Sequence, residues 1–138
     1  MIVLDASLVG PICIPDEAAD LGPAAWDVML ANPLCVPGHW RLEVANMLRS
    51  AVRRERLTPA QRDLALRRLR QLPVRLDQNG WDTAWDRVIA LSEAHDLTPY
   101  DASYLELAAR LGTPLATRDR KLARAAEACA VVTLDFRT

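Results

Sequence analysis

Short apolar runs alternate with stretches of helical periodicity along the whole chain. The apolar runs are IVLD (2–5), LCVP (34–37), PLAT (114–117) and VVTL (131–134), and PVRLD (73–77) is either a fifth strand or a loop. Helical patterns cover 16–31, 39–56, 59–71, 81–95, 100–111 and 119–128. Strands that alternate with helices are typical of a parallel sheet, because each parallel crossover needs a connection of helix length. We therefore predict an α/β fold with a central, mostly parallel sheet of four to five short strands flanked by helices.

The composition is that of a single folded domain. Hydrophobic residues make up 51% and charged residues 25% of the 138 residues, which excludes disorder. The three cysteines are odd in number, far apart and flanked by apolar residues, so they predict buried free thiols in a reducing compartment. The start MIVLDASLVG has no basic leader, and no apolar run is long enough to cross a bilayer. We expect a cytoplasmic protein that does not bind membranes.

Positive charge is concentrated in the middle of the chain. Nine arginines lie between Arg49 and Arg75, against only two acids, Glu55 and Asp63, although the net charge of the chain is -1. An arginine-rich block either faces a polyanion or an acidic protein, or is simply a solvated helical face. The two helices that carry it are predicted to form an arginine-rich hairpin at about 39–71 within a single domain of residues 1–138.

The segment LTPYDASYLELAARLG (97–112) predicts an amphipathic helix with one carboxylate on its apolar side. Thr98 and the proline that follows it are predicted to start the helix, and TPAQ (58–61) has the pattern of a complete capping box. At about 100° per residue, Asp101 falls within the apolar arc, whereas Glu106 falls on the polar side. An unpartnered buried carboxylate is costly, so we expect backbone amides, an arginine or a metal ion to compensate Asp101.

Three further acids lie where a parallel sheet would bring them near Asp101. Asp5 and Asp119 follow apolar runs, and ligands bind at the carboxyl edge of strands in open α/β sheets. Each of the two could equally well cap the helix that follows it. Glu43 lies at the margin of the apolar stripe of its helix, where it is solvated, paired with an arginine such as Arg54, or part of the same acidic group.

Taken together, the four acids predict a site for a hard divalent cation. Mg²⁺ and Mn²⁺ prefer oxygen ligands, and several carboxylates at one sheet edge would repel each other strongly without an ion. His39 and His95 are isolated and lack the spacing of a zinc site. The chain contains no Ser-His-Asp arrangement, glycine-rich phosphate loop or dinucleotide fingerprint.

Four motifs in order resemble the PIN domains, and most closely the VapC-type toxins of bacterial toxin–antitoxin pairs. These are IVLDAS at the start, EVAN (43–46), YDASYLELA (100–108) and LATRDRKLARAA (115–126). The resemblance covers nearly the whole chain and implies an endoribonuclease that depends on Mg²⁺ or Mn²⁺. It assigns the catalytic and metal-binding roles to four acids: Asp5, Glu43, Asp101 and Asp119.

The resemblance also implies supporting residues and partners. Ser7, Asn46 and Thr117 match the polar positions of the family near the metal. A small antitoxin protein and a homodimer are expected on the same ground. Pro11 and Pro15 are unusual for the family, and we expect them to shorten or bend the first helix.

The RNA contacts follow from charge and position alone. Arg118 and Lys121 flank Asp119 and could bind phosphates, as could Arg49 and Arg53 on the hairpin, although ordinary solvated charges would look the same. The alternatives in function are a housekeeping PIN nuclease or a non-catalytic module that binds RNA or protein. A phosphohydrolase of the haloacid dehalogenase type is a further rival, but Ser7 stands where that family has a second aspartate.

Four tryptophans are numerous for a chain of this length. They are Trp26, Trp40, Trp81 and Trp85. Trp81 and Trp85 are spaced by one helical turn, so we expect most of the four in the core, with stacking on nucleic-acid bases as the alternative.

Overall fold

Five short parallel strands form the centre of the molecule in the computed structural model, which describes residues 1–137. They are β1 (Ile2–Leu4), β2 (Leu34–Val36), β3 (Val74–Leu76), β4 (Leu115–Ala116) and β5 (Thr133–Leu134). All neighbouring strands are parallel, and their order across the sheet is β3-β2-β1-β4-β5. The predicted α/β fold is confirmed, and the segment 73–77 forms a strand.

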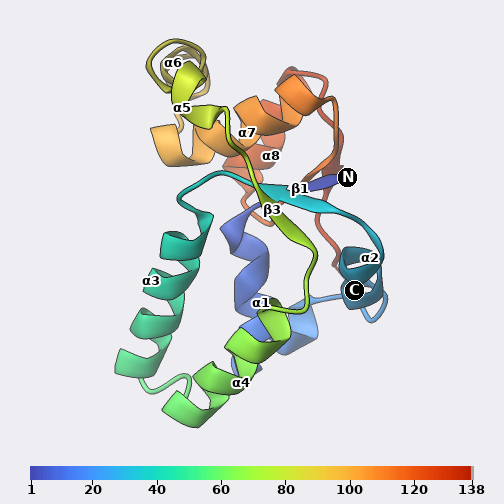
Figure 1. Ribbon diagram of the computed structural model, residues 1–138, viewed down its shortest axis with the longest axis vertical. Helices are drawn as coiled ribbons and strands as arrows, with labels where there is room; N and C mark the ends of the chain where they lie inside the picture. The colour runs from blue at the N-terminus through green and yellow to red at the C-terminus, as the bar shows by residue number, and fades with distance from the viewer. Residues whose placement is uncertain (138) are drawn as a thin grey trace.

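The strand order reverses at one position of the sheet. The chain moves from β1 to β2 and β3 in one direction, and then returns to add β4 and β5 on the other side of β1. Connections therefore leave β1 and β4 in opposite directions, and the carboxyl ends of two such strands are where open α/β sheets bind ligands. In Figure 1, α1 (Val9–Cys13), α3 (Trp40–Arg53) and α4 (Pro59–Leu69) lie below the sheet, and α7 (Pro99–Leu111) and α8 (Arg120–Ala128) lie above it.

The helices α3 and α4 are joined by a turn with a complete capping box. The Thr58 amide donates to Gln61 Oε1 at 2.8 Å, and the Gln61 amide donates to Thr58 Oγ1 at 3.1 Å, as predicted. Arg56 in the same turn forms ion pairs with Asp16 and Glu17, at 2.7 and 2.8 Å. These bonds fix the far end of the α3–α4 pair to the segment that follows α1.

The N-terminal helical region is more broken than predicted. A 3₁₀ turn, η1 (Ala6–Leu8), leads into α1, which ends before Pro15, so the first helix is short as expected. The predicted helix over 16–31 is wrong, because this segment divides into a 3₁₀ helix, η2 (Pro15–Asp20), and α2 (Ala25–Ala31). Pro23 disfavours a helical conformation at Gly22, and the Gly22 amide donates instead to the Phe136 carbonyl at 2.6 Å.

The predicted helix over 81–95 is present, but its tryptophans are not in the core. It consists of α5 (Gly80–Thr83), a π-helical segment η3 (Ala84–Val88) and α6 (Ile89–His95). Trp81 is 80% exposed and Trp85 is 92% exposed, so the prediction of a buried pair is wrong. Trp40 is buried, and Trp26 is half-buried beneath the guanidinium of Arg68. The spacing of Trp81 and Trp85 by one helical turn therefore does not reflect packing against the core of this chain.

The helix α7 buries one acid that the helical pattern placed on its polar side. Glu106 is 1% exposed, which corrects that prediction. Arg110, one turn later, lies 2.8 Å from Glu106 Oε1 and 2.6 Å from Asp77 Oδ2, so one guanidinium neutralises both carboxylates. The helix then ends at Gly112, whose φ of 64° is in the left-handed region that glycine adopts readily.

The three cysteines are free thiols. Cys13 and Cys35 are buried as predicted, and burial raises the pKa of the Cys13 thiol to about 11, whereas Cys129 is only half-buried. Within residues 1–137, none of the helices is long and apolar enough to cross a membrane.

Candidate functional site

The site is built where β1 and β4 end side by side. Leu4 pairs with Ala116, and the Asp5 amide donates to the Ala116 carbonyl at 2.9 Å, so Asp5 and Thr117 are neighbours just beyond the strands. The Thr117 hydroxyl donates to Asp5 Oδ2 at 2.7 Å. Asp5 is 4% exposed and Thr117 is 2% exposed, so this hydrogen bond lies in the interior at the carboxyl edge of the sheet.

A second layer of hydrogen bonds orders the loop after β4. The Asp119 amide donates to Thr117 Oγ1 at 3.0 Å, and the Arg118 amide donates to Ser7 Oγ at 2.9 Å. Ser7 Oγ also lies 3.4 Å from Thr117 Oγ1. The two hydroxyl residues expected near the acids therefore connect the loops that follow β1 and β4.

Asp119 also caps a helix, as the simpler interpretation of the sequence predicted. Its Oδ1 accepts a hydrogen bond from the Leu122 amide at 3.0 Å at the start of α8. Capping uses only one of the two carboxylate oxygens, so this role does not prevent Asp119 from binding a ligand as well.

Asp101 lies in the first turn of α7, close to two of the other acids. Thr98 caps the helix by accepting from the Asp101 amide at 3.1 Å, as predicted. Burial raises the pKa of the Asp101 carboxyl, and the negative charges of Asp119 and Glu43 raise this pKa further. Asp101 is therefore near the other acids, and none of the arginines in residues 1–137 forms an ion pair with it.

Asp5 is the most deeply buried of the four acids. Burial raises the pKa of its carboxyl from 3.8 to about 6; the Thr117 hydrogen bond opposes this rise, and the charges of Asp101 and Glu43 add to it. The electrostatic coupling of Asp5 to Asp101 and Glu43, and of Asp101 to Asp119, indicates one acidic cluster rather than four separate surface charges.

Glu43 enters the cluster from the first turn of α3, and its partner is a residue that sequence analysis set aside. His39 Nε2 lies 2.8 Å from Glu43 Oε1, so the ion-pair partner of Glu43 is this histidine and not Arg54, the arginine that the sequence offered as one alternative. The His39 ring also packs edge-on against Tyr100 and Tyr104, with centroids 5.4 Å away in both cases. His39 appeared isolated in the sequence because these contacts form only when α3 and α7 come together.

Tyr104 is a second residue that the sequence did not identify as part of the site. Its side chain is fully buried, and its hydroxyl has no hydrogen-bond partner within residues 1–137. The pKa of the phenol is raised far above its ordinary value by burial and by the charges of Glu43 and Asp5. The phenol therefore remains protonated and is a neutral donor beside the acids.

The donor set of this cluster fits a hard divalent cation. No three His, Cys, Asp or Glu side chains in residues 1–137 are already arranged to hold an ion. However, Glu43 Oε1 is buried and lacks a well-directed hydrogen bond in the same part of the chain, and the charges of neighbouring carboxylates raise the pKa values of Asp5 and Asp101. An oxygen-preferring cation would relieve this repulsion and provide a partner for the buried carboxylate oxygen.

The basic residues proposed for RNA are placed less favourably than the acids. Arg118 pairs with Asp20 at 3.2 Å, and Lys121 pairs with Asp96 at 2.9 Å. Arg49 and Arg53 are exposed, but they lie six and ten residues beyond Glu43 on α3, which is about 9 and 15 Å along the helix axis. Asn46 is also exposed on α3.

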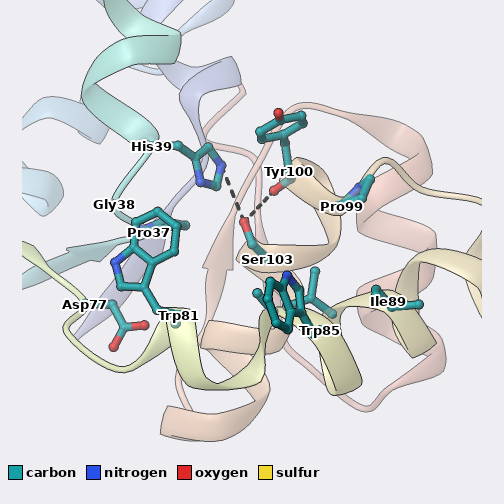
Figure 2. Close-up of a pocket in the computed structure, with 13 residues that line it drawn as sticks. Pro37, Gly38, His39, Asp77, Trp81, Trp85, Ile89, Pro99, Tyr100 and Ser103 are labelled. Atoms are coloured by element: carbon teal, nitrogen blue, oxygen red, sulfur yellow. Dashed lines mark hydrogen bonds between the residues drawn. The ribbon is translucent and has the colours of Figure 1, made fainter.

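An aromatic pocket adjoins the acidic cluster. Figure 2 shows Trp81, Trp85, Tyr100 and His39 around this pocket, with Ser103 between the histidine and the α7 backbone. Its volume is about 380 Å³. His39 belongs both to the pocket and to the acidic cluster through its contact with Glu43.

The comparison with known protein families agrees with this fold and with the sequence motifs. The PIN domain model matches residues 2–128, a range that contains all four acids. The chain belongs to the PIN-domain family. Within it, the chain is 31% identical to ribonuclease VapC3 of Pyrobaculum aerophilum over 122 residues, which cover 88% of this chain and 92% of that relative. The predicted resemblance to VapC-type PIN domains is therefore confirmed.

A solved structure supports the PIN fold independently. The crystal structure of PAE2754 from Pyrobaculum aerophilum superposes with a TM-score of 0.68, covering 96% of this chain and 82% of that one. The sequence identity is 23%, so this likeness concerns the fold alone.

Proposed function

We propose that this PIN domain is a metal-dependent endoribonuclease of the VapC type. The observation that carries the proposal is the cluster of Asp5, Glu43, Asp101 and Asp119 at the carboxyl edge of β1 and β4, in which burial and the neighbouring negative charges raise the pKa values of the Asp5 and Asp101 carboxyls. The likeness to a protein called ribonuclease VapC3 supports RNA as the substrate. The acids, rather than the arginines, are the part of the molecule that determines the chemistry.

Asp5, Asp101 and Asp119 would hold one or two Mg²⁺ or Mn²⁺ ions, with Glu43 binding directly or through a water molecule. A bound ion of this kind supplies an activated water for attack on a phosphodiester and neutralises charge on the phosphate. Thr117 fixes the orientation of Asp5 through its 2.7 Å hydrogen bond. Glu43, whose Oε1 is in contact with His39 Nε2 at 2.8 Å, would accept a proton from the attacking water through its carboxylate.

The remaining assignments are extensions of the same proposal. The chain acts as the toxin of a toxin–antitoxin pair, in the cytoplasm, and a cognate small antitoxin inhibits it. The arginine-rich hairpin at about 39–71, within one domain of residues 1–138, supplies the exposed Arg49 and Arg53 for contacts with RNA phosphates. Arg118 and Lys121 can contribute only by exchanging Asp20 and Asp96 for phosphate. A homodimer is also part of the proposal.

Substitution of Asp101 by asparagine tests the proposed chemistry. Asp101→Asn keeps the size of the side chain and removes one charged oxygen ligand, so we expect RNA cleavage in Mn²⁺ to fall by more than about 100-fold. Asp63→Asn is the matched control, since Asp63 is exposed on α4 and outside the cluster. Circular dichroism of both variants should match that of the parent.

The outcome separates the candidate functions. Equal RNA cleavage by Asp101→Asn and the parent contradicts the metal site. Failure of the parent itself to cleave RNA at millimolar Mn²⁺ favours a non-catalytic module that binds RNA or protein. Cleavage without an antitoxin-like protein encoded beside the gene favours a housekeeping PIN nuclease.

A further inference from the structure

His39 and Glu43 lie one turn apart at the start of α3. His39 is the N-cap residue of the helix, and Glu43 is in its first turn. The Glu43 amide donates to the His39 carbonyl at 3.0 Å, so this first turn is closed and the two side chains share one side of the helix. The spacing of four residues therefore brings the imidazole to the carboxylate, with His39 Nε2 2.8 Å from Glu43 Oε1.

The His39 ring is held in place by a second helix, α7. The rings of Tyr100 and Tyr104 both meet it edge-on, at interplanar angles of 71° and 76°. Tyr104 is fully buried, so it forms a rigid wall behind the imidazole. Figure 2 shows the imidazole directed toward Ser103, which lies on the same helix as the two tyrosines. A ring enclosed in this way has little freedom to turn away from Glu43.

The neighbours of His39 Nε2 determine which ring nitrogen carries the hydrogen. The Ser103 hydroxyl donates its proton to the Tyr100 carbonyl, so toward Nε2, at 3.4 Å, its oxygen acts as an acceptor. The ionised Glu43 carboxylate is also an acceptor. Both groups that face Nε2 are acceptors, which assigns the hydrogen to this nitrogen. The N–H is shared between them, in agreement with a contact to Glu43 Oε1 that is close but not well directed.

The contact with His39 leaves part of the Glu43 carboxylate for a ligand. Glu43 Oε1 is buried, yet 31% of the Glu43 side chain is exposed, so the exposed surface lies on the rest of the side chain. Within residues 1–137, Glu43 forms no ion pair except the one with His39. A carboxylate that is ordered before a cation arrives loses less side-chain freedom on binding, and ligating carboxylates are commonly held by such outer contacts.

We propose that His39 is a positioning residue, which holds Glu43 in place for the divalent cation or for the water that the cation activates. It acts through Glu43 and not by contact with RNA. Tyr100 immediately precedes Asp101 in the first turn of α7, so the ring packed against Tyr100 also sets how Glu43 on α3 lies relative to Asp101 on α7. This inference rests on the proposed metal-dependent cleavage and adds to it a residue outside the four acids.

The substitutions His39→Ala and His39→Gln test the positioning role. Glutamine carries an amide nitrogen where the histidine side chain carries Nε2, so it can donate to Glu43, whereas alanine cannot. Isothermal titration calorimetry with manganese chloride, in the absence of RNA, measures the affinity of each protein for Mn²⁺. We expect His39→Ala to weaken this affinity by about 10–100-fold and His39→Gln to stay within about threefold of the parent.

RNA cleavage at saturating Mn²⁺ provides a second measurement. We expect kcat of His39→Ala to fall by about 10–100-fold while KM stays within about threefold of the parent, and we expect His39→Gln to recover most of kcat. His95→Ala is the matched control, because His95 lies beside Cys129 at the end of α6 and should behave as the parent in both assays. A merely structural role would instead lower the metal-free thermal unfolding midpoint of both His39 variants.

Nuclear magnetic resonance tests the contact without metal or substrate. Long-range proton–nitrogen correlation spectra of the imidazoles at pH 8 should show a hydrogen on His39 Nε2. The resonance of this nitrogen should move in Glu43→Gln, because the charged acceptor is lost, and should not move in Asp63→Asn, an exposed acid on α4.

The positioning role is overturned if His39→Ala binds Mn²⁺ and cleaves RNA like the parent, if His39→Gln does not restore what His39→Ala loses, or if Nε2 carries no hydrogen. In a parent that binds Mn²⁺ but does not cleave RNA, the ribonuclease proposal fails, while a weaker Mn²⁺ affinity of His39→Ala still supports the positioning role. A parent that does not bind Mn²⁺ overturns both the metal site and the role of His39.

Discussion

Replacing Asp5 by asparagine should stabilise the metal-free protein. Asp5 is 4% exposed and accepts a hydrogen bond from the Thr117 hydroxyl. An asparagine carbonyl oxygen can accept the same hydrogen bond and carries no charge. The substitution therefore removes a buried charge while it retains the main contact of the side chain.

The size of the effect follows from the pKa of the Asp5 carboxyl. It is about 6 in the fold, because of burial and the charges of Asp101 and Glu43, against 3.8 ordinarily. A pKa difference of about 2 corresponds to about 3 kcal/mol. Below pH 3.8 both the folded and unfolded states are protonated and Asp5 has no effect. As the pH rises from 3.8 to about 6 the folded state alone keeps the proton, so the penalty grows, and above about 6 it is complete.

Urea unfolding in the presence of a chelator measures this difference. At pH 8 we expect Asp5→Asn to unfold with a free energy up to about 3 kcal/mol greater than the parent, with the gap closing toward pH 4. Asp63→Asn, an exposed acid on α4, should leave the unfolding free energy nearly unchanged at both pH values. An Asp5→Asn variant that is no more stable than the parent at pH 8 would refute the assigned burial and charge coupling of Asp5.

Addition of Mn²⁺ should largely close the gap in stability between the parent and Asp5→Asn. A ligand present at 100 times its dissociation constant stabilises the native state by about 2.7 kcal/mol, which nearly offsets the penalty at Asp5. The parent should gain this stabilisation, whereas Asp5→Asn should gain much less. An equal gain in both proteins would place the ion elsewhere.

Two further predictions concern other parts of the molecule. Arg110→Ala should lower the free energy of unfolding by about 3–5 kcal/mol, because the carboxylates of Glu106 and Asp77 are only 2% and 7% exposed and would lose their shared cation. Urea unfolding at pH 7 measures this loss, and a loss below about 1 kcal/mol would contradict the prediction. Thr58→Ala should cost about 1 kcal/mol by breaking the capping box at the start of α4, as thermal unfolding would show, and an unchanged midpoint would mean that this turn frays in solution.

The sheet could be predicted from sequence because its strands are short, apolar and separated by helical patterns. Each of the four segments predicted as strands forms one, and 73–77, for which a loop was the alternative, forms the fifth; all pair in parallel. The order of the strands was not accessible in the same way, because it depends on which crossover packs on which face. The helix predicted over 16–31 is interrupted at Gly22 and Pro23. The helical spacing of apolar residues continues through these two positions, but the proline disfavours a helical conformation at the residue before it.

The position of the acidic cluster was partly encoded in local sequence. Asp5 and Asp119 end strands, and the helical angle of Asp101 directs it inward, so these three could be placed from the sequence. His39 and Tyr104 could not, because their proximity to Glu43 arises only from the contact between α3 and α7. The burial of Glu106 was missed for a similar reason. Its cation, Arg110, lies one turn later on the same helix, but Arg110 is also held by Asp77, which follows β3 and is distant in the sequence.

The tryptophans of the helical segment 80–95 mark the limit of what apolar periodicity can predict. Spacing by four residues indicates that one side of a helix will be covered, but it does not indicate by which chain. In one copy Trp81 and Trp85 remain 80% and 92% exposed, so the core of the same chain does not cover them. The spacing therefore predicted which side of the helix is apolar, and it did not predict what that side contacts. His39 connects this side of the helix to the acidic cluster, because it lines a pocket together with Trp81 and Trp85 and lies 2.8 Å from Glu43, so a change in the packing of the tryptophans would reach Glu43 through one side chain.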